Sequence, residues 1–139
     1  MRQFTARVAF VLPLLAAVAG CSGTINDIPT TPDPVIVTDT FTGSLNINGA
    51  QTHFVFLGAT GTVTATLTSL GETAPSKVGF SMGTLAGTTC TTVLFNDSAV
   101  VTSVLSGTVS TLGGSLCVRI YDTGALTGTV PYTLTVSHP

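Results

Sequence analysis

A serine between two glycines is the arrangement in this 139-residue sequence that comes nearest to a catalytic motif. The segment 79–83, Gly-Phe-Ser-Met-Gly, has the spacing of a nucleophile elbow, and Asp97 or Asp122 followed by His138 would supply the rest of a triad. An elbow needs a helix directly after the serine, whereas the glycines and threonines that follow Ser81 favour a turn and a strand. We therefore interpret Ser81 as a strand residue and expect that the protein is not an enzyme.

Metal ligation is the second chemistry that the residue types allow. His53 and His138 have no partner at the spacing of a zinc site, so we expect both to be solvated surface histidines. Asp97 and Asp122 lie in polar, turn-like segments and could each offer oxygen ligands to calcium. Calcium needs roughly six to eight oxygens, and the alternative is that each carboxylate caps its own turn. We expect no cofactor and keep the two aspartates as weak calcium candidates.

The first 20 residues have the features of an export signal. Two arginines are followed by the apolar run 8–19, and small residues precede Cys21. The run has 12 residues, fewer than the roughly 20 that a transmembrane helix needs. Val18-Ala19-Gly20-Cys21 resembles the lipobox of bacterial lipoproteins. That resemblance implies cleavage before Cys21, diacylglycerol and palmitate on this cysteine, and attachment to a membrane. Cleavage after Ala19 without lipidation is the alternative that the sequence leaves open.

Export also bears on the other two cysteines, because an exported chain reaches an oxidising compartment. If Cys21 carries lipid, Cys90 and Cys117 are the only thiols left, and we predict a disulfide between them. Two reduced cysteines remain the alternative, since the sequence does not give their separation in space. Cys117 alternates with apolar neighbours, which places the bridge on the outer face or rim of a sheet.

Residues 21–38 are predicted to be a lipidated N-terminus followed by an extended linker. Three prolines stand there among threonine and aspartate without helical periodicity, and about 3.1 Å per residue would give a reach of some 50 Å. Ser22 occupies the position where an aspartate retains many lipoproteins at the inner membrane. The resemblance therefore implies a cell-envelope location, with the outer membrane favoured if the cell is Gram-negative.

Apolar residues alternate with threonine, serine and glycine over 39–139, which is the period of half-buried strands. In 62–67, for example, Val63, Ala65 and Leu67 share one face. Asn48-Gly49 predicts a hairpin turn that pairs the first two strands. Further strand-like runs are 77–82, 89–95, 99–105, 116–120 and 130–136. We predict an all-β domain, a two-sheet antiparallel β-sandwich of about eight short strands.

The domain also resembles the bacterial pre-peptidase C-terminal domain, a jelly-roll-like β-sandwich attached to secreted peptidases and other surface proteins. The segments that carry the likeness are 41–45, 53–56, 113–122 and 132–136. The resemblance implies a jelly-roll-like fold without catalytic activity, and it implies that binding of extracellular polymers or calcium occurs in some relatives. No peptidase precedes the domain in this sequence, which departs from the usual arrangement of that family.

The net charge of the mature chain limits the kinds of partner that it can bind. Removal of the leader leaves Lys77 and Arg119 against six acidic residues, a formal charge of −4 (2 minus 6). No basic patch remains for nucleic acid. Arg119 and Tyr121 share the outer face of a strand, where the guanidinium could stack on the ring. We predict a non-catalytic, membrane-anchored module of the cell envelope with an interaction or accessory role, whose partner is an envelope protein or a polysaccharide. Carbohydrate or calcium binding, with threonine-rich faces and Tyr121 contacting polysaccharide, is the alternative.

Overall fold

The computed structural model describes residues 32–72 and 77–139. The predicted leader, Cys21 and the linker up to residue 31 lie outside the described residues. Residues 32–36 form no strand and lead into the first one, which begins at Val37. Within the described part no helix is long and apolar enough to cross a membrane.

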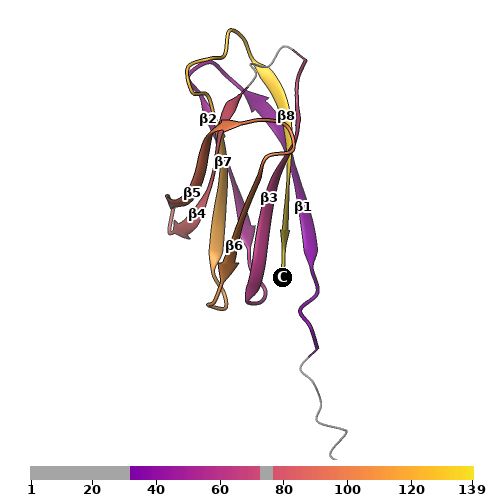
Figure 1. The fold of residues 1–139 in the computed structure, drawn as a ribbon. Helices are drawn as coiled ribbons and strands as arrows, with labels where there is room; N and C mark the ends of the chain where they lie inside the picture. The colour runs from indigo at the N-terminus through magenta and orange to yellow at the C-terminus, as the bar shows by residue number, and fades with distance from the viewer. Residues whose placement is uncertain (1–31, 73–76) are drawn as a thin grey trace, which may run out of the picture. The chain divides into compact units, whose positions relative to one another are not determined.

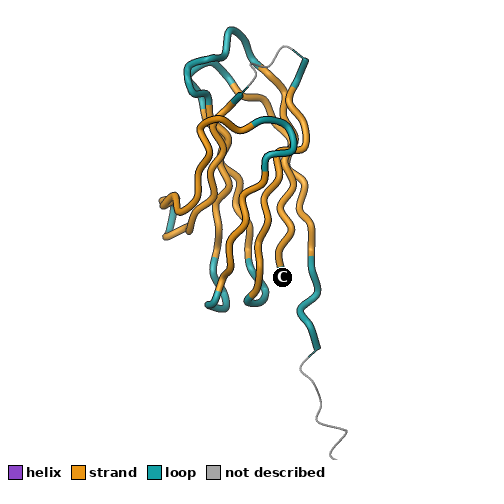
Figure 2. Tube along the Cα trace, viewed as in Figure 1, coloured by secondary structure: helices purple, strands orange, loops and turns teal. Residues whose placement is uncertain are grey.

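Eight strands form two four-stranded antiparallel sheets, and the described residues contain only strands and loops (Figures 1 and 2). Sheet A has the order β1-β8-β3-β6 and sheet B the order β2-β7-β4-β5. The predicted all-β, two-sheet sandwich is confirmed. The strands are β1 (Val37–Leu45), β2 (Ala50–Phe56), β3 (Gly61–Leu70), β4 (Val78–Ala86), β5 (Thr89–Ala99), β6 (Val104–Val109), β7 (Ser115–Tyr121) and β8 (Val130–His138).

The strand pairs are nested, with β1 on β8, β2 on β7, β3 on β6 and β4 on β5, which is the connectivity of a jelly roll. The predicted pairing of the first two strands is therefore wrong. The turn at Asn48 carries the chain from sheet A to sheet B. Consecutive strands pair directly in β4 and β5, which form a hairpin. Asn48 does adopt a positive φ of 53°, and the Gly49 N–H donates to the Asn46 carbonyl at 2.9 Å.

The core lies between the sheets and follows the predicted alternation. Val63, Ala65 and Leu67 of β3 are fully buried, as are the matching residues of β7 and β8. Full burial of one such aliphatic side chain stabilises the fold by about 1.5 to 3 kcal/mol. The largest fully buried side chains are Phe80, Leu45, Leu67, Ile120 and Leu134.

The run 99–105, predicted as a strand, is divided in the structure between the end of β5, a turn and the start of β6. β5 ends at Ala99 and β6 begins at Val104, with a turn between them in which Thr102 has a positive φ of 78°. The Ser103 hydroxyl accepts from the Val100 N–H at 2.9 Å, and the Ser103 N–H donates to the Val100 carbonyl. Serine satisfies backbone groups in this way at turns, a signal that the apolar pattern hides.

Candidate binding face

Ser81 lies in the middle of β4, not at a turn before a helix. Its neighbours Phe80 and Met82 point into the core, as predicted, and Ser81 itself is only 3% exposed on the opposite face. It pairs with Arg119 of β7 and Phe95 of β5. A serine in continuous strand with partners on both sides does not have the geometry of a nucleophile elbow.

The two histidines are not solvated, so that prediction is wrong. His53 is part-buried and His138 is 6% exposed. Both stand on the core-facing phase of their strands, with Val55 two residues after His53 and Val136 two residues before His138. His138 Nε2 lies 3.2 Å from the Asp39 carboxylate on the neighbouring strand.

His53 joins the two sheets along the side where β1 and β2 meet. Its ring stacks on Phe41 at a centroid distance of 4.7 Å, and its Nε2 lies 2.7 Å from the Tyr132 hydroxyl. Phe41 and Tyr132 belong to sheet A, whereas His53 belongs to sheet B. Burial lowers the pKa of His53 from its ordinary value of 6.5. The neutral ring is therefore the form that this cluster favours.

The carboxylate of Asp122 organises the turn between β7 and β8. One oxygen accepts from the Asn48 N–H at 2.8 Å, and the other accepts from the N–H groups of Gly124, Ala125 and Leu126. These bonds, that from Asn48 first, lower the pKa of Asp122 below its ordinary 3.8. Calcium would have to displace four backbone donors here, so the geometry favours the turn-capping alternative.

Asp97, the other calcium candidate, accepts a hydrogen bond from the Tyr121 hydroxyl. Burial and the Asp97 carboxylate raise the pKa of Tyr121 to about 12, so the phenol remains a donor at neutral pH. The described residues contain no group of three or more His, Cys, Asp or Glu side chains that could hold a metal ion. The structure thus ties each aspartate to its own partners and does not bring the two into one cluster.

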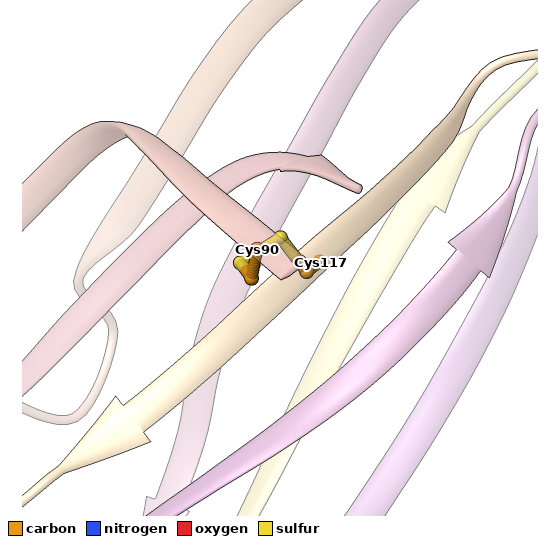
Figure 3. The surroundings of a disulfide bond; sticks show 2 residues. All are labelled: Cys90 and Cys117. Atoms are coloured by element: carbon orange, nitrogen blue, oxygen red, sulfur yellow. A yellow bond between two sulfur atoms is a disulfide. The ribbon is translucent and has the colours of Figure 1, made fainter. Parts of the chain in front are cut away.

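Cys90 of β5 and Cys117 of β7 form the predicted disulfide, with Cα atoms 5.9 Å apart (Figure 3). The bridge crosses β4, which lies between these strands. Gly83 of β4 pairs with Cys117 on one side and Thr92 on the other, and a Cβ there would overlap the backbone of Thr91. Glycine thus lets β5 bend over the sheet. Cys117 points outward, as predicted, but the bridge and bent hairpin bury it fully.

A second crossing of β4 occurs at Gly79. The Tyr121 ring lies over this glycine, where any Cβ would overlap it, and its hydroxyl reaches Asp97 on β5. Arg119 lies between the two crossings, with its guanidinium carbon 5.6 Å from the centroid of the Tyr121 ring. The predicted stacking of Arg119 on Tyr121 is confirmed. Sheet B is therefore clamped on its outer face by the side chains of β7.

Two exposed phenylalanines flank this clamp. Phe54 on β2 is 47% exposed and Phe95 on β5 is 65% exposed. Three strand spacings of about 4.8 Å separate their strands, so the surface spans roughly 14 Å. We name Phe54, Phe95, Arg119 and Tyr121 the aromatic face. Among the described residues His138 and Asp39 form an ion pair, and Arg119 forms none. The Arg119 charge therefore has no carboxylate partner in this part of the chain.

Phe54 and Phe95 were missed as candidate site residues. In 53–57, His-Phe-Val-Phe-Leu, both phases of the strand are apolar, so alternation does not say which phase faces the core. The structure buries Val55 and Leu57 and leaves Phe54 and Phe56 outside.

Comparison with known proteins gives little further guidance. No protein-family model matches the chain, and no curated protein matches it in sequence. Among solved structures it is similar to PliG of Aeromonas hydrophila, a periplasmic lysozyme inhibitor of g-type lysozyme. The TM-score is 0.49 and the identity 20%, over 72% of this chain and 84% of that one. A likeness of this size carries no argument about function.

Proposed function

We propose that this protein is a non-catalytic binding module, anchored at the cell envelope by lipid on Cys21, that presents its aromatic face to an envelope component. The outer membrane is the favoured site of attachment because Ser22 follows the lipidated cysteine. The domain, predicted as residues 39–139 and beginning in the structure with β1 at Val37, is the functional part, and the residues from Cys21 up to β1 are its lipidated N-terminus and linker. The leader 1–20 is removed on export.

The aromatic face is the observation that carries the proposal. Exposed aromatic and arginine side chains are enriched where proteins bind partners, because they bury much apolar area and still offer a polar group. Phe54 and Phe95 lie on either side of Arg119, which the Tyr121 ring supports and which has no carboxylate partner among the described residues. The disulfide and the Tyr121–Asp97 bond fix the strands below, so the face is preorganised for binding.

Ser81 and the two histidines, which a hydrolase would use, are engaged in other contacts, and this supports a role in binding. Ser81 is buried within a strand. His53 contacts Tyr132, and His138 contacts Asp39. None of these hydrogen bonds brings a histidine to a serine, as acyl-transfer chemistry would require.

Affinity capture from envelope extracts tests the proposal. The bait is the mature protein, and the matched variants are Phe95→Ser on the aromatic face and Val104→Ser on the outside of sheet A, where Val104 is 53% exposed. We expect a component that the wild type and Val104→Ser retain and Phe95→Ser loses. Equal capture by all three proteins would contradict a function of the aromatic face.

Polysaccharide is the second candidate ligand, favoured by the exposed aromatic side chains and by Thr52, whose hydroxyl-bearing side chain stands beside Arg119 in the strand pairing. Co-sedimentation with purified envelope polysaccharide, using the same pair of variants, distinguishes it from a protein partner. Calcium binding at Asp97 or Asp122 predicts a rise in thermal stability on addition of calcium, because binding to the native state stabilises it. The hydrogen bonds of both carboxylates favour no such rise.

A further inference from the structure

The two ends of the sandwich differ in composition. We call the end at which the chain enters β1 the proximal end. It carries the loops 57–60 and 110–114, which lie side by side at this end in Figure 2, whereas the β4–β5 hairpin with residues 87–88 bends away to the side. The distal end carries the turns 46–49 and 100–103 and the longer connections before β4 and β8.

Charge is unevenly divided between these ends. The proximal loops 57–60 and 110–114 contain no charged residue. The distal connections contain Glu72, Lys77 and Asp122. The charged residues on the proximal side are Asp33, before β1, and Asp39, which is paired with His138. A surface without basic residues has no long-range attraction for anionic groups, and one almost without charge avoids the cost of desolvating ions.

Large apolar side chains protrude from the proximal end. Phe56, at the last position of β2, is 74% exposed, and Leu112, in the loop before β7, is 72% exposed. Val35 and Ile36, just before β1, are 79% and 61% exposed. At the distal end the exposed apolar side chains are less exposed: Ile47, Val100 and Val101 are 50%, 46% and 40% exposed. The most exposed apolar residues therefore coincide with the least charged loops.

We infer that the proximal end is a membrane-contacting surface, with Phe56 and Leu112 inserted among the lipid headgroups and the distal end facing away. This inference rests on the proposed anchor, since the linker from Cys21 joins the domain at this same end. Apolar side chains on uncharged loops partition into the bilayer interface without needing anionic lipid. A linker that remained fully extended, about 3.1 Å per residue, would instead hold the domain away from the lipid.

Tryptophan reporters can test the orientation cleanly, because the chain contains no tryptophan. Mature protein without lipid is coupled through Cys21, its one thiol outside the disulfide, to a maleimide lipid in phosphatidylcholine vesicles. Leu112→Trp reports on the proximal end and Ile47→Trp on the distal end. Quenching by phosphatidylcholine with brominated acyl chains then measures how close each tryptophan lies to the bilayer.

We expect the emission of Leu112→Trp to shift to the blue and to be quenched, with no change for Ile47→Trp. Adding Phe56→Asp to Leu112→Trp should reduce the quenching, whereas raising the salt concentration should not, because no ion pair is involved. Equal quenching at both positions, or none at Leu112→Trp, would overturn the inference. Since the tether is made chemically, either outcome is independent of whether cells attach lipid to Cys21.

Discussion

Loss of the Cys90–Cys117 disulfide should destabilise the domain strongly. The two cysteines are separated by 27 residues, and on the chain-entropy model a loop of that size corresponds to about 3.5 kcal/mol at 25 °C. In a domain of roughly 100 residues, each kcal/mol moves Tm by about 4 to 8 °C, so Tm should fall by roughly 15 °C or more. The loss of about 3.5 kcal/mol is a large share of the free energy of unfolding of a typical domain, roughly 5 to 15 kcal/mol.

Circular dichroism melts of the oxidised protein, the reduced protein and the double variant Cys90→Ala/Cys117→Ala provide the measurement. The reduced protein retains both sulfur atoms, so it separates the effect of the cross-link from the packing lost with fully buried Cys117. We expect both forms to melt well below the oxidised protein. A fall of less than about 5 °C in both would refute the reasoning, because the bent β5 would then be held over Gly83 without the bridge.

Three further predictions concern the His53 cluster, the Tyr121 crossing and the anchor. Burial lowers the pKa of His53 in the folded protein, so as the pH decreases the unfolded chain takes up this proton before the folded one does. The free energy of unfolding should therefore decrease at pH values below about 6.5. Thermal unfolding measured at a series of pH values should show this loss of stability in the wild type and not in His53→Phe. Gly79→Ala should cost about 1 to 3 kcal/mol in denaturant unfolding, because its Cβ displaces the Tyr121 ring, whereas Gly128→Ala, in open space, should be neutral. Cys21→Ser protein should leave the membrane fraction on washing, because Phe56 and Leu112 bury less apolar surface than a single acyl chain, which itself binds a membrane only marginally. Retention of Cys21→Ser in the membrane fraction would contradict the anchor.

The sequence was sufficient to predict the fold class, because alternation at period two is a direct consequence of strand geometry. The sheet partners were not predictable in the same way. Asn48-Gly49 marks a turn, but a turn does not say whether the next strand pairs with the last or crosses to the other sheet. Nested pairing joins β1 to β8 across most of the chain, and no local signal encodes it.

The histidines illustrate a limit that physical reasoning could have removed. His53 and His138 stand in phase with buried valines, so the alternation already placed them toward the core, where Tyr132 and Asp39 are their partners. The aromatic face is a different matter. Phe54 and Phe95 come together only through the order β2-β7-β4-β5, which depends on the whole topology. The exposure of Phe54 was not predictable from residues 53–57, because that strand is apolar on both faces.

The mass of the mature N-terminus tests the central claim, that this module works from a lipid anchor, most directly. Protein extracted from cell membranes is digested, and the N-terminal peptide is identified by mass spectrometry. The account predicts a peptide that begins at Cys21 and carries diacylglycerol and a fatty acyl group. A peptide that begins at Gly20, after cleavage behind Ala19, with an unmodified cysteine, would contradict it.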